Sequence, residues 1–277
     1  MARPVLVVAL LVLSVLAGWY AYASVPNLAY ALGIAKPTVI TGQTYISESG
    51  YYVLDGDVSC ANITGEDACI VFHGHVPDFV LDCRGHSITG PSRPGPGRWF
   101  PADGIEIHSS AGGTVKNCVV KDFGLIGIFL HHSAYNTIIN NTVTNSKLGI
   151  YNDGCGYNDI INNTVTNNNY GIYLFLPSSN HVSIANNTAD ANEIAGIYLF
   201  QSPHDNSLSG NTANANGKYG IWFDPAYNIT LAGNTACGNP GGDVSCANST
   251  VIDGGGNVCG QSSVTCGGSI RCAGGCS

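Results

Sequence analysis

The sequence has few charged residues: Asp, Glu, Lys and Arg together make up 10% of its 277 residues, against about a quarter in an ordinary soluble domain. Ten residues are basic, and the formal net charge is −8. Without a basic patch, the chain has no electrostatic means of binding nucleic acid or anionic lipid. Helical periodicity is also absent from the central part of the chain, which argues against a helical domain there. Gly, Asn, Ser and Thr are abundant, and amide and hydroxyl side chains supply the polarity instead.

One short phrase recurs between residues 127 and 239. It reads Asn136-Thr-Ile-Ile-Asn-Asn-Thr-Val-Thr-Asn followed by Gly149-Ile-Tyr, and it returns 22 residues later as Asn158-Asp-Ile-Ile-Asn-Asn-Thr-Val-Thr-Asn followed by Gly171-Ile-Tyr. A period of this length is typical of a solenoid, in which each unit packs its apolar face against its neighbours. A leucine-rich repeat has a similar length but needs a longer apolar frame and usually a helical return. Short runs of β-branched residues alternating with polar ones favour a parallel β-helix.

An asparagine column supports the stacking of these units. Its members are Asn141, Asn163, Asn187, Asn211 and Asn234, which follow one another at steps of 22, 24, 24 and 23 residues. In a stack of coils, each would lie above the last at one strand spacing, roughly 4.8 Å. A stacked amide donates to one neighbouring coil and accepts from the other, so the column predicts a hydrogen-bonded ladder at a bend.

With these repeats, the chain resembles the right-handed parallel β-helix proteins of the pectin-lyase-like superfamily, especially the carbohydrate-associated NosD-like repeat group. The resemblance covers residues 51–239. It implies an all-β fold, a right-handed parallel β-helix formed as a single-stranded solenoid of about eight or nine coils. Because one such architecture hosts many functions, the function has to be argued from the residues on its surface.

Both ends of the chain differ from the repeats. The N-terminal segment reads as a signal peptide, because Arg3 precedes an apolar run and Ala21-Tyr22-Ala23 offers small residues to a signal peptidase. An uncleaved N-terminal anchor is the alternative. The expected organisation is a signal peptide at 1–23, an N-terminal cap at 24–50, the parallel β-helix at 51–239 and a disulfide-rich C-terminal cap at 240–277. We therefore expect a protein that is secreted or displayed at the cell surface.

Eleven cysteines in an exported chain indicate disulfides. Cys60 and Cys69 bracket a short loop and are expected to pair. Cys83 and Cys118 end matching strands of adjacent coils, within disulfide reach, with an inward pair of thiols as the alternative. Six more stand near the C-terminus, and their pairing stays open: Cys237, Cys246, Cys259, Cys266, Cys272 and Cys276. Cys155 is left over, either as a free thiol or for an intermolecular bond.

Strand alternation assigns two columns to the outer face of the solenoid. Aligning the Gly-Ile strands on their glycines sends the second residue after each glycine outward. The first column reads Val71, Glu106, Phe129, Tyr151, Tyr173, Tyr198 and Trp222. Its aromatic faces would match the C–H faces of sugar rings, so we expect a polysaccharide platform, although stacked aromatics also stabilise strands. The expected substrate-binding residues are Trp99, Glu106, Phe129, Tyr173, Tyr198 and Trp222, with Trp99 supplied by a Pro-rich insertion.

The second column reads His73, His108, His131, Asp153, Phe175, Phe200 and Asp224. The repeat pattern does not require a histidine on successive coils, so this column is the strongest chemical signal in the chain. His73, His108 and His131 are expected to share a divalent metal such as zinc or copper, with calcium as a further candidate. Alternatively, one His acts as a general base beside Glu106 and Tyr151. A row of solvated polar residues is the third interpretation.

These columns lead to three hypotheses. In the first, the protein binds an extracellular polysaccharide or cell-surface glycan and processes it by lyase or epimerase chemistry. The expected catalytic residues are then His108, His131, Tyr151 and Asp153, with His131 as base and Tyr151 as acid. The second is a non-enzymatic structural or adhesive module of the cell surface, and the third is a metal-binding protein of the NosD-like kind. The acidic net charge favours a neutral glycan over a polyanion.

Overall fold

The computed structural model describes residues 36–63, 68–91, 102–260, 266, 270–273 and 275–276 of the chain. The predicted signal peptide, the first part of the predicted N-terminal cap and Trp99 lie outside the described residues. All regular structure in the described part is β-strand, and no helix there is long and apolar enough to cross a membrane.

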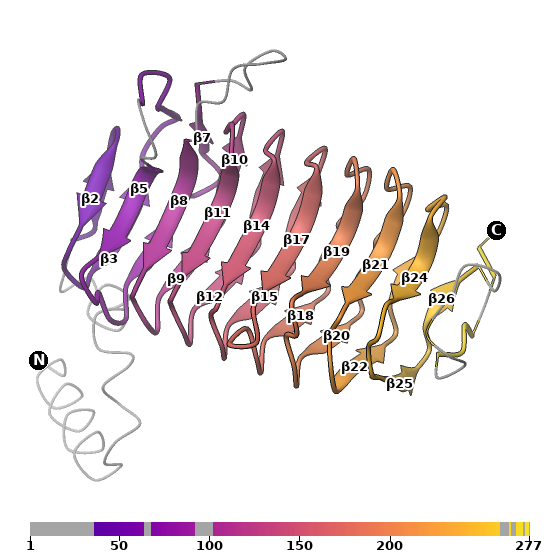
Figure 1. Ribbon diagram of the computed structural model, residues 1–277. Helices are drawn as coiled ribbons and strands as arrows, with labels where there is room; N and C mark the ends of the chain where they lie inside the picture. The colour runs from indigo at the N-terminus through magenta and orange to yellow at the C-terminus, as the bar shows by residue number, and fades with distance from the viewer. Residues whose placement is uncertain are drawn as a thin grey trace, which may run out of the picture.

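The strands stack into a parallel solenoid with three faces (Figure 1). Sheet A contains, in spatial order, β1 (Thr38–Ile40), β3 (Tyr51–Leu54), β6 (Val80–Asp82), β9 (Thr114–Lys116), β12 (Thr137–Ile139), β15 (Asp159–Ile161), β18 (Ser183–Ala185), β20 (Ser207–Ser209), β22 (Ile229–Ala232) and β25 (Val251–Gly255). Sheet B contains β2 (Thr44–Ile46), β5 (Ala68–His73), β8 (Asp103–His108), β11 (Ile126–His131), β14 (Leu148–Asp153), β17 (Tyr170–Phe175), β19 (Ala195–Phe200), β21 (Tyr219–Asp224) and β24 (Gly242–Cys246). Sheet C contains β4 (Val58–Ser59), β7 (Ser87–Thr89), β10 (Val119–Lys121), β13 (Thr142–Thr144) and β16 (Thr164–Thr166), and β23 (Thr235–Ala236) pairs with β26 (Val258–Cys259).

Sheet B is the broadest wall of the solenoid, because most of its strands have six residues whereas those of sheet A have mostly three (Figure 1). Along β11, Ile128 and Leu130 point into the core and are fully buried, while Phe129 and His131 are half-buried on the outer face. The same alternation repeats on the neighbouring coils in register. This alternation is what the β-branched and polar pattern of the repeat predicts.

The predicted asparagine ladder is confirmed. The side-chain amide of Asn163 donates to Oδ1 of Asn187 at 3.0 Å, and that of Asn187 donates to Oδ1 of Asn211 at the same distance. Each Oδ1 also accepts the backbone N–H of the preceding ladder residue, as in the 2.8 Å bond from Asn163 to Asn187. The ladder is buried throughout and runs on to Asn257. Each buried amide therefore closes a bend that backbone pairing alone leaves unsatisfied.

The stack is longer at both ends than the expected 51–239 segment. Parallel pairing begins with Thr38 opposite Tyr52 in sheet A and Thr44 opposite Ile70 in sheet B. At the other end it continues to Cys259, which lies opposite Ala236. The first coils lack the Asn and Gly phrase of the central repeats, and the last coil keeps only the ladder residue Asn257, so the repeated phrase does not reach the ends of the stack.

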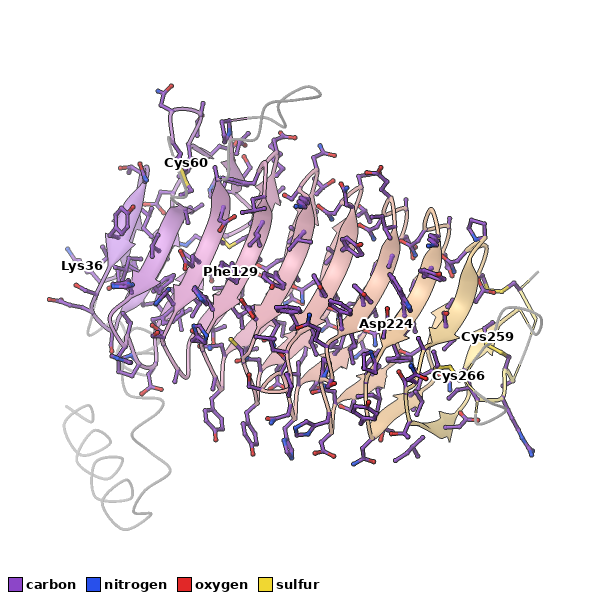
Figure 2. The ribbon with its side chains drawn as sticks, viewed as in Figure 1. Lys36, Cys60, Phe129, Asp224, Cys259 and Cys266 are labelled. Atoms are coloured by element: carbon purple, nitrogen blue, oxygen red, sulfur yellow. A yellow bond between two sulfur atoms is a disulfide. The ribbon has the colours of Figure 1, made fainter. Side chains whose placement is uncertain are left out.

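Five disulfides hold the two ends of the solenoid. The expected Cys60–Cys69 and Cys83–Cys118 pairs are both present. The pairing that stayed open near the C-terminus is Cys237–Cys276, Cys246–Cys266 and Cys259–Cys272. Figure 2 shows Cys60 near one end and Cys259 and Cys266 at the other.

Cys155 is the free cysteine of the described chain, and it is buried. Its sulfur accepts the backbone N–H of Ser133 at 2.9 Å, in a turn position that Ser133 itself holds one coil earlier. Burial raises the pKa of the Cys155 thiol to about 12. A thiol in this position is closed to another chain, so of the two alternatives for Cys155 the free thiol is correct.

Candidate functional site

The two predicted outward columns form on the outer face of sheet B. His73 lies opposite His108, and His108 lies opposite His131. Next in the column, His131 lies opposite Asp153. In the other column, the residues run in register from Glu106 through Phe129 to Trp222. Figure 2 shows Phe129 and Asp224 on this same face.

Two imidazoles of this face converge on a single carboxylate oxygen. Oε1 of Glu106 lies 3.1 Å from Nδ1 of His108 and 3.4 Å from Nδ1 of His131. All three side chains are half-buried, and their donor atoms lie within 4.8 Å of one another. We call Glu106, His108 and His131 the carboxylate–imidazole cluster. Neighbouring coils supply its members, so the cluster depends on the register of β8 and β11.

Aromatic rings fix the orientation of His131. The Phe129 ring stacks on it at a centroid distance of 4.8 Å and an interplanar angle of 11°. The ring centroid of His132, the next residue, lies 4.4 Å from that of His131. The ring of His108 packs edge-on against His131 at a centroid distance of 4.6 Å. A ring held by Glu106 on one nitrogen and by packing on its faces presents its remaining nitrogen in one direction.

Tyr151 and Asp153 continue the site on the next coil. Burial, and then the charge of Asp153, raise the pKa of Tyr151 well above its usual range. The Oδ1 atom of Asp153 is buried and has no hydrogen-bond partner within the described structure. Buried carboxylate oxygens normally accept a hydrogen bond. The Oδ1 atom of Asp153 is therefore an unused acceptor, and it lies beside the Tyr151 phenol, which stays protonated.

His73, which the sequence grouped with His108 and His131 as a metal ligand, is not part of the carboxylate–imidazole cluster. Its ring centroid lies 4.9 Å from that of His108, and its side chain is exposed. The third donor that joins His108 and His131 is Glu106, which the sequence assigned to substrate binding. Glu106 and His108 belong to different outward columns of β8, but a glutamate side chain is long enough to reach from one column to the other.

The aromatic column differs from the expected platform in its orientation. Centroids lie 5.2 Å apart between Phe129 and Tyr151, 4.9 Å between Tyr173 and Tyr198 and 4.1 Å between Tyr198 and Trp222, with interplanar angles of 15° in each pair. The ring faces therefore pack against one another and the edges point outward. The expected platform required ring faces free to meet the C–H faces of sugar rings, whereas rings spaced by one coil are close enough to stack on one another.

Burial in this stack is deepest at Tyr198, which is only 5% exposed. Burial also raises the pKa of Tyr173 and Tyr198, so both phenols stay neutral. Lys218 lies over the Trp222 ring, 5.9 Å from its centroid, at the C-terminal end of the column. The column thus presents ring edges and hydroxyl groups to a ligand.

Sequence reasoning missed a second row of rings. Tyr135, Tyr157 and His181 stack one above the other on the turn that follows sheet B. Their steps of 22 and 24 residues match those of the asparagine column. That spacing was the available signal, but these residues lie outside the strands on which the columns were aligned.

The parallel pairing of all these coils, in three sheets with an outward polar and aromatic wall, defines the protein as a β-solenoid. Residues 103–263, more than half of the chain, match the family described as right-handed β-helix region. The chain belongs to this family, which confirms the predicted right-handed parallel β-helix. No curated protein sequence matches the chain.

Several solved structures share the fold. The Dettilon tailspike protein matches with a TM-score of 0.59 and 19% identity, over 91% of this chain and 64% of its own. The A-module of a mannuronan C-5 epimerase from Azotobacter vinelandii gives 0.56 and 13%, over 91% and 90%. A pectate lyase gives 0.59 and 16%, over 84% and 71%. At these identities the likeness shows the fold alone.

Proposed function

We propose that the protein binds an extracytoplasmic polysaccharide along the outer face of sheet B and acts on it at the carboxylate–imidazole cluster. The observation that carries this proposal is the convergence of His108 and His131 on one oxygen of Glu106, at the end of a column of aromatic edges. The fold adds support, because solved structures that share it include a pectate lyase and a mannuronan epimerase. Five disulfides favour an oxidising compartment.

The cluster suits removal of a proton from a sugar carbon. With Glu106 accepting from Nδ1–H of His131, the other ring nitrogen of His131 is the basic one. The net charge of −8 favours a neutral glycan, but removal of a C5 proton requires a uronate, whose carboxyl group makes that proton acidic. On a uronate the expected reaction is β-elimination: His131 takes the C5 proton, the C4–C5 double bond forms, and the C4–oxygen bond breaks. Tyr151 gives its proton to the departing oxygen, a role that its protonated phenol fits. An epimerase would instead return a proton to C5 from the opposite side.

Turnover on a panel of neutral and uronate polysaccharides tests this assignment. His131→Ala should lower the rate of a cleaved substrate by about a hundredfold or more, since general-base catalysis contributes factors of this size. Asn162→Gly is the matched control, because Asn162 is exposed with φ of 54° and glycine keeps that backbone. A rate for His131→Ala equal to that of the control would remove His131 from the chemistry. If native protein and control bind no glycan, the structural or adhesive module and the metal-binding protein are the remaining hypotheses.

A second candidate function is metal binding by Glu106, His108 and His131. Two separations of their donor atoms, 3.1 and 3.4 Å from Glu106 Oε1 to the two Nδ1 atoms, are close to the edge of a tetrahedron with metal–ligand bonds of about 2.0–2.1 Å, which is about 3.3 Å. All three donor atoms lie within 4.8 Å of one another. Two imidazoles favour zinc or copper over calcium, which prefers oxygen ligands. Three protein donors leave one position of such a site open, and a metal there would supply a Lewis acid to a bound ligand.

Calorimetric titration with Zn²⁺ separates this candidate from the acid–base assignment. A metal site predicts one ion bound per chain and loss of binding in His108→Ala, whereas His73→Ala should bind as the native protein does. Activity that persists in the presence of a chelator would assign His131 to proton transfer, because a metal would occupy Nδ1 of His131, the nitrogen that donates to Glu106 in the acid–base assignment.

A further inference from the structure

A row of exposed rings lies on the turn between each sheet B strand and the following strand of sheet A. Tyr135, Tyr157 and His181 hold this position on three successive coils, and all three side chains are exposed. The ring centroids are 5.0 Å apart between Tyr135 and Tyr157 and 4.7 Å apart between Tyr157 and His181, with interplanar angles of 14° and 9°. We call these three residues the turn ledge.

The backbone at this position disfavours aromatic residues. The φ angles of Tyr135, Tyr157 and His181 are 58°, 57° and 53°, in the left-handed region that Gly, Asn and Asp enter most readily. Other coils use such residues at the matching position: Asp78, Gly112, Asp205 and Asn228. Each ring therefore adds backbone strain relative to glycine. Stacking between the rings offsets part of this cost.

Tyr135, at the N-terminal end of the ledge, keeps a free face. Tyr157 has a neighbouring ring on each side, whereas the matching residue on the coil before Tyr135 is Gly112, which has no side chain. Tyr135 is 62% exposed, the highest exposure among the large hydrophobic residues of the described chain. In the sheet B column, by contrast, the ring faces are covered by neighbouring rings.

A sugar ring stacks through its C–H face on an aromatic face, so a free face is what such a contact requires. We infer that Tyr135 stacks on a pyranose ring of the bound glycan, which makes the turn ledge a second contact site beside sheet B. This inference rests on the proposed function. Tyr135 follows His131 by one tight turn of the same coil, so a single chain can reach both the carboxylate–imidazole cluster and the ledge.

Affinity for an oligosaccharide identified on a glycan array tests the inference. Tyr135→Ala should weaken binding about tenfold, since one ring contact of this kind accounts for about that factor. Tyr135→Phe keeps the ring face and should bind within about twofold of the native protein. Tyr227→Ala, which removes another exposed ring four coils further along, is the matched control.

A second variant covers the face without removing the ring. Gly112 has φ of 74°, which Asn tolerates, and a Cβ added there lies 2.5 Å from the Asp78 carboxylate, whose end must turn aside. Gly112→Asn should therefore fold, as its melting temperature will show, and should lose affinity about as much as Tyr135→Ala.

The outcomes separate this inference from the proposed function. Native affinity in both Tyr135→Ala and Gly112→Asn, with binding lost in the double variant His108→Ala/His131→Ala, would overturn the ledge and leave the proposed function standing. Loss in the two ledge variants alone, with Tyr227→Ala unchanged, supports the ledge. Absence of glycan binding by the native protein would overturn both.

Discussion

Two columns of the same solenoid differ in how much their residues vary. The inward ladder holds Asn at every step from Asn141 to Asn257, because each amide must bond the coil above and the coil below. The outward column of sheet B changes from His73, His108 and His131 to Phe175 and Phe200 at matching positions. Hydrogen bonding between coils fixes the residue type of the first column, while the second column, which makes no such bonds along its whole length, differs from coil to coil. Where a repeat protein keeps a residue, the fold requires it, and where it departs from its own pattern, function is the better explanation.

Breaking the ladder should have the largest effect on stability. Asn187→Ala removes an oxygen that accepts two hydrogen bonds from Asn163 and an amide that donates to Ile160 and Asn211. Leaving such buried groups unpaired should cost about 3 kcal/mol of unfolding free energy. Chemical denaturation measures this cost, with the exposed Asn162→Gly as the control. A cost below about 0.5 kcal/mol, the range of an ordinary surface substitution, would show that the ladder does not hold the bends.

Changing Glu106 should do the reverse, lowering activity without lowering stability. Glu106→Gln keeps the shape of the side chain but removes the charge that orients His108 and His131. We expect turnover to fall about 10- to 100-fold, as when an orienting partner is removed from a functional histidine. The melting temperature should stay within a degree or two of the native value. A large fall in melting temperature with turnover intact would make Glu106 a structural residue.

Truncating the aromatic column should have a smaller, mainly structural effect. Tyr173 stacks on Tyr198 at 4.9 Å and lies 5.2 Å from Tyr151, so Tyr173→Ala should cost about 1–2 kcal/mol of stability. Tyr173→Phe should cost less, because the ring contacts survive. Glycan affinity of the Phe variant tells whether the outward hydroxyl edge contributes to binding. An unchanged stability in the Ala variant would contradict the packing described for the column.

Cys155 should give the smallest response of all. Its pKa is raised by burial to about 12, so the thiol stays protonated at pH 8, well below that value, and no thiolate is available to an alkylating reagent. Native protein at pH 8 should take up no iodoacetamide, and protein unfolded without reduction should take up one equivalent. Labelling of the native protein would contradict the buried position of Cys155.

The fold followed from the sequence because its signal is repeated. A spacing of about two dozen residues, seen in Asn141, Asn163 and Asn187, specifies which positions lie above one another, and strand alternation then specifies which point outward. The same logic placed His108 beside His131 and paired Cys83 with Cys118. The cysteines near the C-terminus do not recur at the spacing of the repeat, so their pairing could not be predicted from the sequence.

Side-chain conformation was beyond the reach of that logic. Register brought Glu106 next to Phe129 in one column, but only coordinates show its carboxylate bending across to two imidazoles of the other column. In the same way, the sequence placed the aromatic column outward without revealing that its rings stack face to face. The turn ledge was overlooked because the alignment followed the strands and Tyr135 lies in a turn.

The central claim is that the glycan lies on sheet B over the carboxylate–imidazole cluster, and the eight histidines of the chain offer a direct test. Imidazole resonances, assigned through single His→Gln variants, can be followed by NMR while an oligosaccharide is added. The account predicts that the signals of His108 and His131 shift with the ligand, while that of His86, beside Asp57 and directly before β7 of sheet C, does not. A ligand that saturates the protein and leaves the His108 and His131 signals unmoved would contradict it.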